Sequence, residues 1–202
     1  MRIDEMIAAV QQVLGVDVDG KPGPQTWGAL YERLVHKKIA NQAPAEAIAM
    51  VDARSEKNIA TLQPEVRPMA RALVQKAAPQ GITIQVISGL RTDAEQDKLY
   101  AQGRTDPGKI VTNVRGGYSN HNFGIAFDVA VFEGSKYLDR STKYKAVGAL
   151  GMDLGLEWGG NWKTIVDQPH FQLRPVWALK LSESEMVAEL RNRRAAGKPF
   201  YP

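Results

Sequence analysis

Two short helical patterns open the chain. Between residues 3 and 14, apolar side chains recur every three or four positions, which predicts an amphipathic helix that ends at Gly15. A loop rich in Asp, Gly and Pro follows over residues 17–24, where glycine and proline favour turns. A second apolar stripe, from Trp27 to Val35, predicts another helix. The first helix is expected to carry its apolar residues on one face, made of Ile3, Met6, Ile7, Val10, Val13 and Leu14.

Further helical patterns occur later in the chain. Apolar spacing predicts a helix from Pro64 to about Ala78, with the proline in the first turn. Thr92 and Glu95 have the spacing of a capping box, which predicts a helix through Tyr100. A third helix is expected over residues 142–154. Ser182 and the residues after it predict a last helix that buries Met186, Val187 and Leu190 and exposes Arg191, Arg193 and Arg194.

Strand patterns lie between these helices. Residues 82–87 alternate and are β-branched, and strands are also expected over residues 126–132 and 170–173. In residues 126–132, alternation puts Asp128 on the opposite face from Phe127 and Val129. A carboxylate on a strand is costly unless it is paired or binds a metal, which favours a ligand role for Asp128.

A change of pattern within residues 44–58 predicts a boundary between two units. These residues read as an Ala-rich, charged helix or linker. We therefore expect a helical unit and linker over residues 1–50, a main domain over residues 51–181, and a C-terminal helix and tail over residues 182–202.

Composition excludes some classes of protein. The 202 residues are 44% hydrophobic and 24% charged, which is ordinary for a globular protein. The net charge of +4, from 26 basic and 22 acidic residues, is too weak to indicate nucleic-acid binding, although it suits a polyanionic envelope. Without cysteine there is no disulfide framework. We expect no Sec-type signal peptide and no stable membrane insertion, because no basic-then-apolar leader and no long apolar run is evident.

Two of the three histidines lie in patterns that can bind a metal. His121 and Asp128 are seven residues apart, and His170 follows much later. Three protein ligands leave one tetrahedral position open for water, as catalytic zinc requires. Asp167, three residues before His170, could act on that water without binding the metal. Such spacing also arises by chance in many proteins, and a satisfied core or surface histidine is the competing interpretation. We expect His36 to be a solvated surface residue.

The motif Ser119-x-His-x-x-Gly-x-Ala-x-Asp128, followed by Asp167-x-x-His170, resembles a family of zinc peptidases that cut peptidoglycan peptides. These are the D-alanyl-D-alanine carboxypeptidases and the L-alanyl-D-glutamate endopeptidases of phage endolysins and bacterial autolysins. The resemblance implies that His121, Asp128 and His170 hold one zinc ion per chain and that Asp167 is the general base. It also implies an α+β fold, in which helices flank a small antiparallel sheet that carries the ligands.

The same resemblance extends to substrate contacts. Arg91 and Gln96 match the family pattern Ser-Gly-x-Arg-(Ser/Thr) with a following Gln, which implies that Arg91 stabilises charge on the scissile carbonyl oxygen. A surface ion pair is the alternative for Arg91. Ser119 is expected to orient the substrate or a ligand. Trp158 and Trp162 are core residues or, for one of them, part of the cleft, and Trp162 is assigned to the substrate site.

The N-terminal pattern resembles the helical peptidoglycan-binding module of cell-wall hydrolases. It carries Gln11, Leu14-Gly15, Asp19-Gly20, Gly23-Pro24 and Thr26 at the module's spacing, but a helix expected before this pair is missing. The alternative is a helical hairpin that docks on the main domain.

Together these patterns predict a monomeric zinc endopeptidase that cleaves peptidoglycan stem peptides at the L-alanyl-D-glutamate bond. A D-alanyl-D-alanine carboxypeptidase is the alternative, because both enzymes share these ligands. A non-catalytic wall-binding protein with a structural metal is less favoured, since structural zinc usually has four protein ligands. We expect synthesis in a host cytoplasm and action on the cell wall after release, as in phage lysis.

Overall fold

The computed structural model describes residues 2–31, 49–163 and 165–202, and its contacts divide the chain into the units Met1–Ala47 and Ile48–Pro202. In the first unit, helix α1 spans Ile3–Leu14 and helix α2 spans Pro24–Tyr31. Gly15 ends α1 with a φ of 71°, as predicted, because glycine adopts this left-handed conformation without strain. The predicted second helix extends to Val35, and its last four residues lie outside the described residues, as does His36.

Gln11 organises the loop between α1 and α2. Its side chain is buried, and its Nε2 donates to Asp19 Oδ1 at 2.7 Å, Lys21 O at 2.9 Å and Thr26 Oγ1 at 2.9 Å. Its Oε1 accepts from the backbone amides of Asp19 and Gly20. The polar motif residues therefore hold the loop in shape. The apolar stripe of α1 is largely exposed at Ile3, Met6, Val10 and Val13.

The second unit is built on a small antiparallel sheet. Strand β1 (Thr83–Ser88) pairs with β2 (Ala126–Glu133), which pairs with β5 (His170–Gln172), which pairs with β4 (Glu157–Trp158). The short strand β3 (Lys136–Leu138) pairs with β2. Each pairing between these strands is antiparallel, and helices accompany the sheet, so the predicted α+β class is confirmed.

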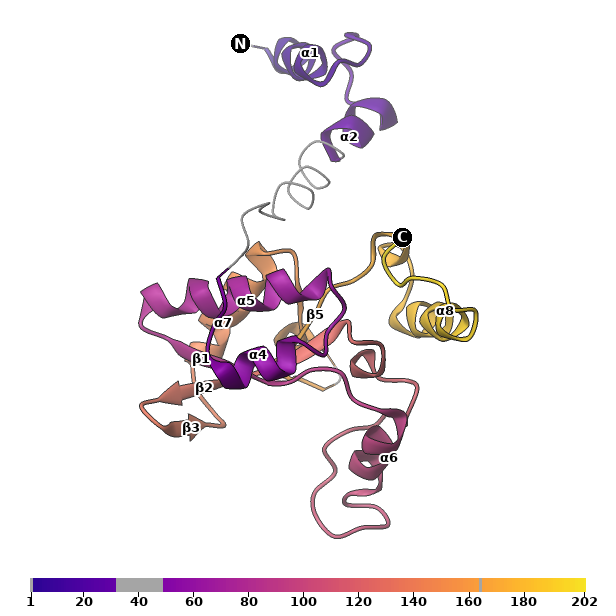
Figure 1. Ribbon diagram of the computed structural model, residues 1–202. Coiled ribbons are helices and arrows are strands. Elements are labelled where there is room, and N and C mark those ends of the chain that lie inside the picture. The colour runs from indigo at the N-terminus through magenta and orange to yellow at the C-terminus, as the bar shows by residue number, and fades with distance from the viewer. Residues whose placement is uncertain (1, 32–48, 164) are drawn as a thin grey trace. The chain divides into compact units, whose positions relative to one another are not determined.

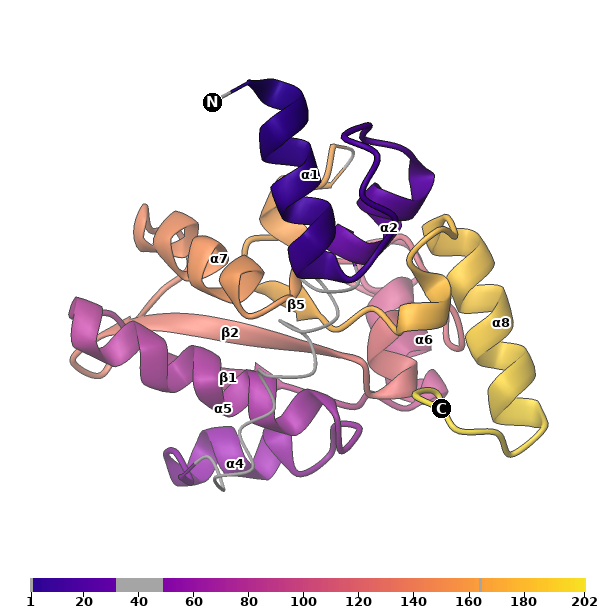
Figure 2. The same ribbon diagram turned by 90° about the horizontal axis from the view of Figure 1, so that it is seen from above.

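Helices α5 (Val66–Ala77) and α7 (Lys143–Asp153) cover one face of this sheet (Figures 1 and 2). Helix α4 (Ala53–Ile59) lies beside the outer edge of β1, where Ser55 and Asn58 bond to the backbone of Val86. Two further helices, α6 (Asp93–Ala101) and α8 (Glu183–Ala195), lie beyond the end of the sheet where β2 begins (Figure 2). Short 3-10 helices connect these elements: η2 (Ala78–Gln80), η3 (Asn120–Phe123), η4 (Gly159–Asn161) and η5 (Val176–Ala178). The helix predicted from Pro64 begins two residues later, at Val66. Among the described residues, no helix is both long and apolar enough to cross a bilayer.

The main core fills the space between the sheet and these helices. Strand alternation directs Phe127, Val129 and Val131 of β2 into it, and Phe171 of β5 stacks on Phe127 with ring centroids 5.8 Å apart. Gly151 lets α7 pack closely against the Phe171 ring, because a Cβ there would lie 2.3 Å from that ring. The opposite face of β2, which carries Asp128, takes no part in this core.

A second core joins α8 to the segment that carries His121. Phe123 and Ile125 pack with Met186, Val187 and Leu190, the three residues predicted to face inward. Arg193 was predicted to be exposed, and this is wrong. Its side chain is only 19% exposed, since it pairs with Glu189 at 3.0 Å and stacks on the Trp177 ring. Arg194 pairs with Asp93 of α6, so α8 also fixes that helix.

We predict that Leu190→Ala will lower the free energy of unfolding of the second unit by about 2–5 kcal/mol, the usual cost of a cavity in a core. Urea denaturation followed by circular dichroism measures this. Asn192→Ala, on the exposed side of the same helix, is the matched control and should change stability by no more than about 0.5 kcal/mol. Equal stability of the two variants would contradict the assignment of α8 to the core.

Candidate metal centre

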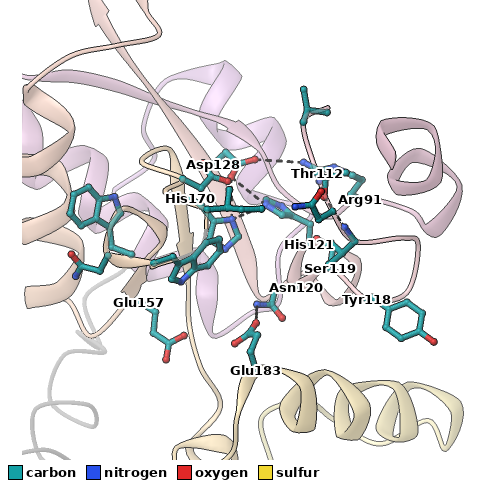
Figure 3. A pocket seen from close by; sticks show the side chains of 18 of the residues that line it. Arg91, Thr112, Tyr118, Ser119, Asn120, His121, Asp128, Glu157, His170 and Glu183 are labelled. Atoms are coloured by element: carbon teal, nitrogen blue, oxygen red, sulfur yellow. Dashed lines mark hydrogen bonds and ion pairs between the residues drawn. The ribbon is translucent and has the colours of Figure 1, made fainter. Parts of the chain in front are cut away.

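His121, Asp128 and His170 converge from three elements of the second unit. Asp128 and His170 are opposite each other in the register of β2 and β5, on the face turned away from the helices, and His121 lies on η3 (Figure 3). His121 Nε2 lies 3.2 Å from His170 Nδ1, and Asp128 Oδ1 lies 3.3 and 3.4 Å from these two nitrogens. Their ligand atoms all fall within 4.8 Å of one another. Among the described residues, these three form the one such group that could hold a metal ion.

The remaining ring nitrogens fix how the two histidines face the cluster. His121 Nδ1 is 2.9 Å from the carbonyl oxygen of Gly89, which can only accept, so Nδ1 carries the proton. His170 Nε2 is 3.0 Å from Gln172 Oε1. The two nitrogens that face each other, His121 Nε2 and His170 Nδ1, are then left with lone pairs.

This donor set fits a cation. Two imidazole lone pairs and one carboxylate oxygen repel one another at these distances unless a positive charge lies between them. Burial alone would raise the pKa of Asp128, but the His121 and His170 rings hold it well below its ordinary value. Burial alone would lower the pKa of His170, but Asp128 and Gln172 raise it. The nitrogen and oxygen donors are those that transition metals accept.

Gly89 holds the backbone oxygen that accepts from His121. A Cβ at this position would lie 2.4 Å from Thr61 Oγ1 and 2.5 Å from Asn58 O, so only glycine fits without movement. The next residues are tied as well, because Leu90 N donates to Thr61 Oγ1 and Arg91 N donates to His121 O. The loop after β1 is thereby clamped between the end of α4 and η3.

Asp167 lies on the wall of the same cavity, three residues before His170. Its amide donates to Gly159 O at 3.0 Å, and its carbonyl accepts from His170 N at 3.3 Å. A Cβ on Gly159 would lie 2.5 Å from Asp167 O, so this glycine permits the close packing. Burial raises the pKa of Asp167, and the negative charge of Asp128 adds to the rise. A carboxylate with a raised pKa accepts a proton more readily than an ordinary one.

Arg91 lies beside the cluster and lines the cavity. Its Nη2 is 3.6 Å from Asp128 Oδ2 and 3.2 Å from Ser88 Oγ, and its Nη1 donates to Gln96 Oε1 at 2.8 Å. Gln96 is fully buried and donates to Thr112 Oγ1 and Val114 O. Gln96 therefore supports Arg91 from behind the cavity wall.

The other predicted site residues also lie around the cavity. Ser119, directly before η3, lines it, and so does Trp162, whose ring centroid is 4.8 Å from that of His170. Trp158 is buried in the main core, and its indole N–H donates to Gln168 O. The loop between α6 and η3 contributes Thr112 and Val114 to the cavity wall.

Sequence reasoning missed the polar residues behind His170. Gln172, Glu157, Arg174, Asn120 and Glu183 are joined by hydrogen bonds and ion pairs near the cavity. Figure 3 shows one of these contacts, between Asn120 and Glu183. Strand alternation could have found Gln172, because it lies two residues after His170 and so on the same face. Glu157, Asn120 and Glu183 carry no comparable local signal.

The chain is similar to several known peptidases. Residues 112–173 match the family described as D-alanyl-D-alanine carboxypeptidase. Over 124 residues the chain is 41% identical to the peptidoglycan L-alanyl-D-glutamate endopeptidase CwlK of Bacillus subtilis, which covers 56% of this chain and 74% of that protein. It is 31% identical over 123 residues to the L-alanyl-D-glutamate peptidase of a Listeria phage, covering 59% of this chain and 40% of that protein. The solved L-Ala D-Glu endopeptidase ChiX of Serratia marcescens matches with a TM-score of 0.48 and 26% identity, over 64% of this chain and 93% of that one.

We predict that Gly89→Ala will weaken metal binding by about 10–100-fold, although residue 89 is not itself a ligand, because the added Cβ displaces the carbonyl that orients His121. Zinc titrated into metal-stripped protein against a chelator measures this affinity. Gly28→Ala is the control, since its Cβ meets nothing within 4 Å. Unchanged affinity in Gly89→Ala would show that the His121–Gly89 contact does not matter for the site.

Proposed function

The chain belongs to the family of peptidoglycan peptidases that includes the D-alanyl-D-alanine carboxypeptidases and the L-alanyl-D-glutamate endopeptidases, and on this premise we propose that it cleaves the L-alanyl-D-glutamate bond of stem peptides. The observation that carries the choice of bond is the 41% identity to an endopeptidase of this specificity, over a stretch that covers 74% of that relative. The phage relative carries the same activity in its name.

We propose zinc as the metal, with His121, Asp128 and His170 as its ligands. Two imidazoles and a carboxylate are a common ligand set of catalytic zinc, which keeps a further position open. Zinc bound there would supply Lewis-acid chemistry, polarising the scissile carbonyl and lowering the pKa of a water molecule to about 7.

In this proposal two side chains take part in the reaction itself. Asp167, with its raised pKa, accepts the proton of the attacking water and returns it to the leaving amine. Arg91 donates to the carbonyl oxygen as negative charge develops on it, because its guanidinium borders the ligand cluster and Gln96 holds it in place. The stem peptide then lies along the cavity between Ser119 and Trp162.

The rest of the chain has a role in the same proposal. The unit at residues 1–50 holds the enzyme on peptidoglycan, which is supported by its motif and by the exposed apolar side chains of α1. The enzyme acts as a monomer, with one zinc ion per chain. It reaches the cell wall after release from a host cytoplasm and lyses the bacterium, as expected of a phage endolysin and in keeping with the phage relative.

Digestion of purified sacculi tests the bond that is cut. We expect mass spectrometry of the products to find new L-alanine C-termini and new N-terminal D-glutamate. Release of D-alanine alone would instead identify a carboxypeptidase and overturn the proposal. The His170→Ala variant, which loses a ligand, is the control and should give neither product.

Asp167→Asn tests the general base. The amide keeps the size of the side chain but cannot accept the proton, so turnover should fall by about 10²–10⁴ while zinc stays bound. The measurement is turnover at saturating zinc, with metal content determined by elemental analysis. Near wild-type turnover under these conditions would remove Asp167 from the reaction and leave it only a role in holding His170.

A further inference from the structure

A row of paired polar side chains crosses the face of the sheet that carries the metal ligands. His170 and Gln172 lie on the same face of β5 because they are two residues apart. In the sheet register, Asp128 of β2 is opposite His170, and Glu157 of β4 is opposite Gln172. Gln172 is fully buried and touches both His170 and Glu157.

The partners of Gln172 allow only one orientation of its amide. Its Nε2 donates to Glu157 Oε2 at 2.6 Å, and an ionised carboxylate can only accept. Its Oε1 accepts from Asn120 Nδ2 at 2.6 Å. Asn120 Nδ2 is identified as the donor because it also donates to the carboxylate of Glu183. Turning the Gln172 amide over would place N–H against N–H at Asn120 and oxygen against oxygen at Glu157.

Arg174 keeps both carboxylates in place as acceptors. Its Nε donates to Glu157 Oε1 at 2.5 Å and its Nη2 donates to Glu183 Oε2 at 2.7 Å. The Arg174 side chain is 13% exposed, whereas those of Glu157 and Glu183 are 38% and 51% exposed, so Arg174 is the buried partner of both ion pairs. A guanidinium has no acceptor, which leaves the two carboxylates with the accepting role toward Gln172 and Asn120.

The fixed amide in turn determines which nitrogen of His170 faces the metal site. Since Gln172 presents its Oε1 to His170 Nε2 at 3.0 Å, that nitrogen must carry the proton. Nδ1, which faces His121 and Asp128, is then the nitrogen with the lone pair. We propose that Glu157, acting through Gln172, is a positioning residue that holds His170 in the one tautomer able to bind the metal. This inference rests on the proposed zinc site.

Exchange of the Glu157 and Gln172 side chains tests whether Glu157 acts on His170 through Gln172. Glu157→Gln leaves two amides facing each other, so Gln172 can turn over and present N–H to His170. Gln172→Leu removes the contact altogether. In each single variant we expect zinc affinity to fall by about 10–100-fold. The double variant, Glu157→Gln with Gln172→Glu, puts a carboxylate next to His170 and an amide next to Arg174, so every donor again meets an acceptor. Its affinity should return to within about threefold of the wild type, a small change beside the loss expected from the single variants.

The measurement is zinc affinity of the metal-stripped full chain, by competition with a chelator, together with the thermal midpoint of the zinc-free protein. Glu133→Gln is the matched control, because it makes the same change at a carboxylate that pairs with Lys143 and takes no part in the hydrogen bonds around Gln172, and it should leave zinc affinity within about threefold of the wild type. A purely structural role would lower the thermal midpoint of the single variants and leave zinc affinity unchanged.

Three results would overturn the proposed role of Glu157: unchanged affinity in Gln172→Leu, a double variant as weak as Glu157→Gln, or an equal loss in Glu133→Gln. If Gln172→Leu does not fold, the comparison of Glu157→Gln with the double variant decides. Failure of the wild-type chain to bind zinc would instead refute the proposed function, so the two failures are distinguishable.

Discussion

The register between β2 and β5 is the constraint on which the site depends. It sets Asp128 opposite His170 on one face and Phe127 opposite Phe171 on the other. A slip of one residue would turn every side chain of a strand to the opposite face, carrying a ligand into the core and a phenylalanine into the cavity. The stacked phenylalanine pair therefore fixes the ligand pair, since one arrangement cannot exist without the other.

Each of the surrounding elements restricts the position or the ring orientation of a metal ligand. The α4 end and Gly89 fix the ring of His121 from one side, and α8 supports η3 from the other through Phe123. Because Gly151 has no side chain, α7 packs directly against Phe171. Gln172 fixes the ring of His170. Ligands preorganised in this way bind a metal without first paying the entropy of being brought together.

Local patterns predicted most of the elements but few of the contacts between them. The helix at residues 3–14, the capping box at Thr92 and the strand that carries Asp128 follow from spacing within one segment. The metal-ligand group was named from its motif, and the structure brings its three members together. Its supports were missed because they are non-local: the carbonyl of Gly89 is 32 residues from His121, and the two contacts of Asn120 reach 52 and 63 residues along the chain. The exposure of Arg193 was predicted wrongly for the same reason, because its contact with the Trp177 ring does not follow from the residues around it.

The attachment of the chain's last residues has a consequence for synthesis. Phe200 packs against Phe123, Tyr201 donates its hydroxyl proton to Leu173 O, and Trp177 donates to Phe200 O. The segment that carries His121 thus completes its core only when residues 177–201 have left the ribosome. Before that point all three ligands have already been made, but η3 lacks the helix that holds it. The site therefore becomes rigid later than its ligands are made, and a chain truncated before residue 177 has every ligand but lacks a rigid site.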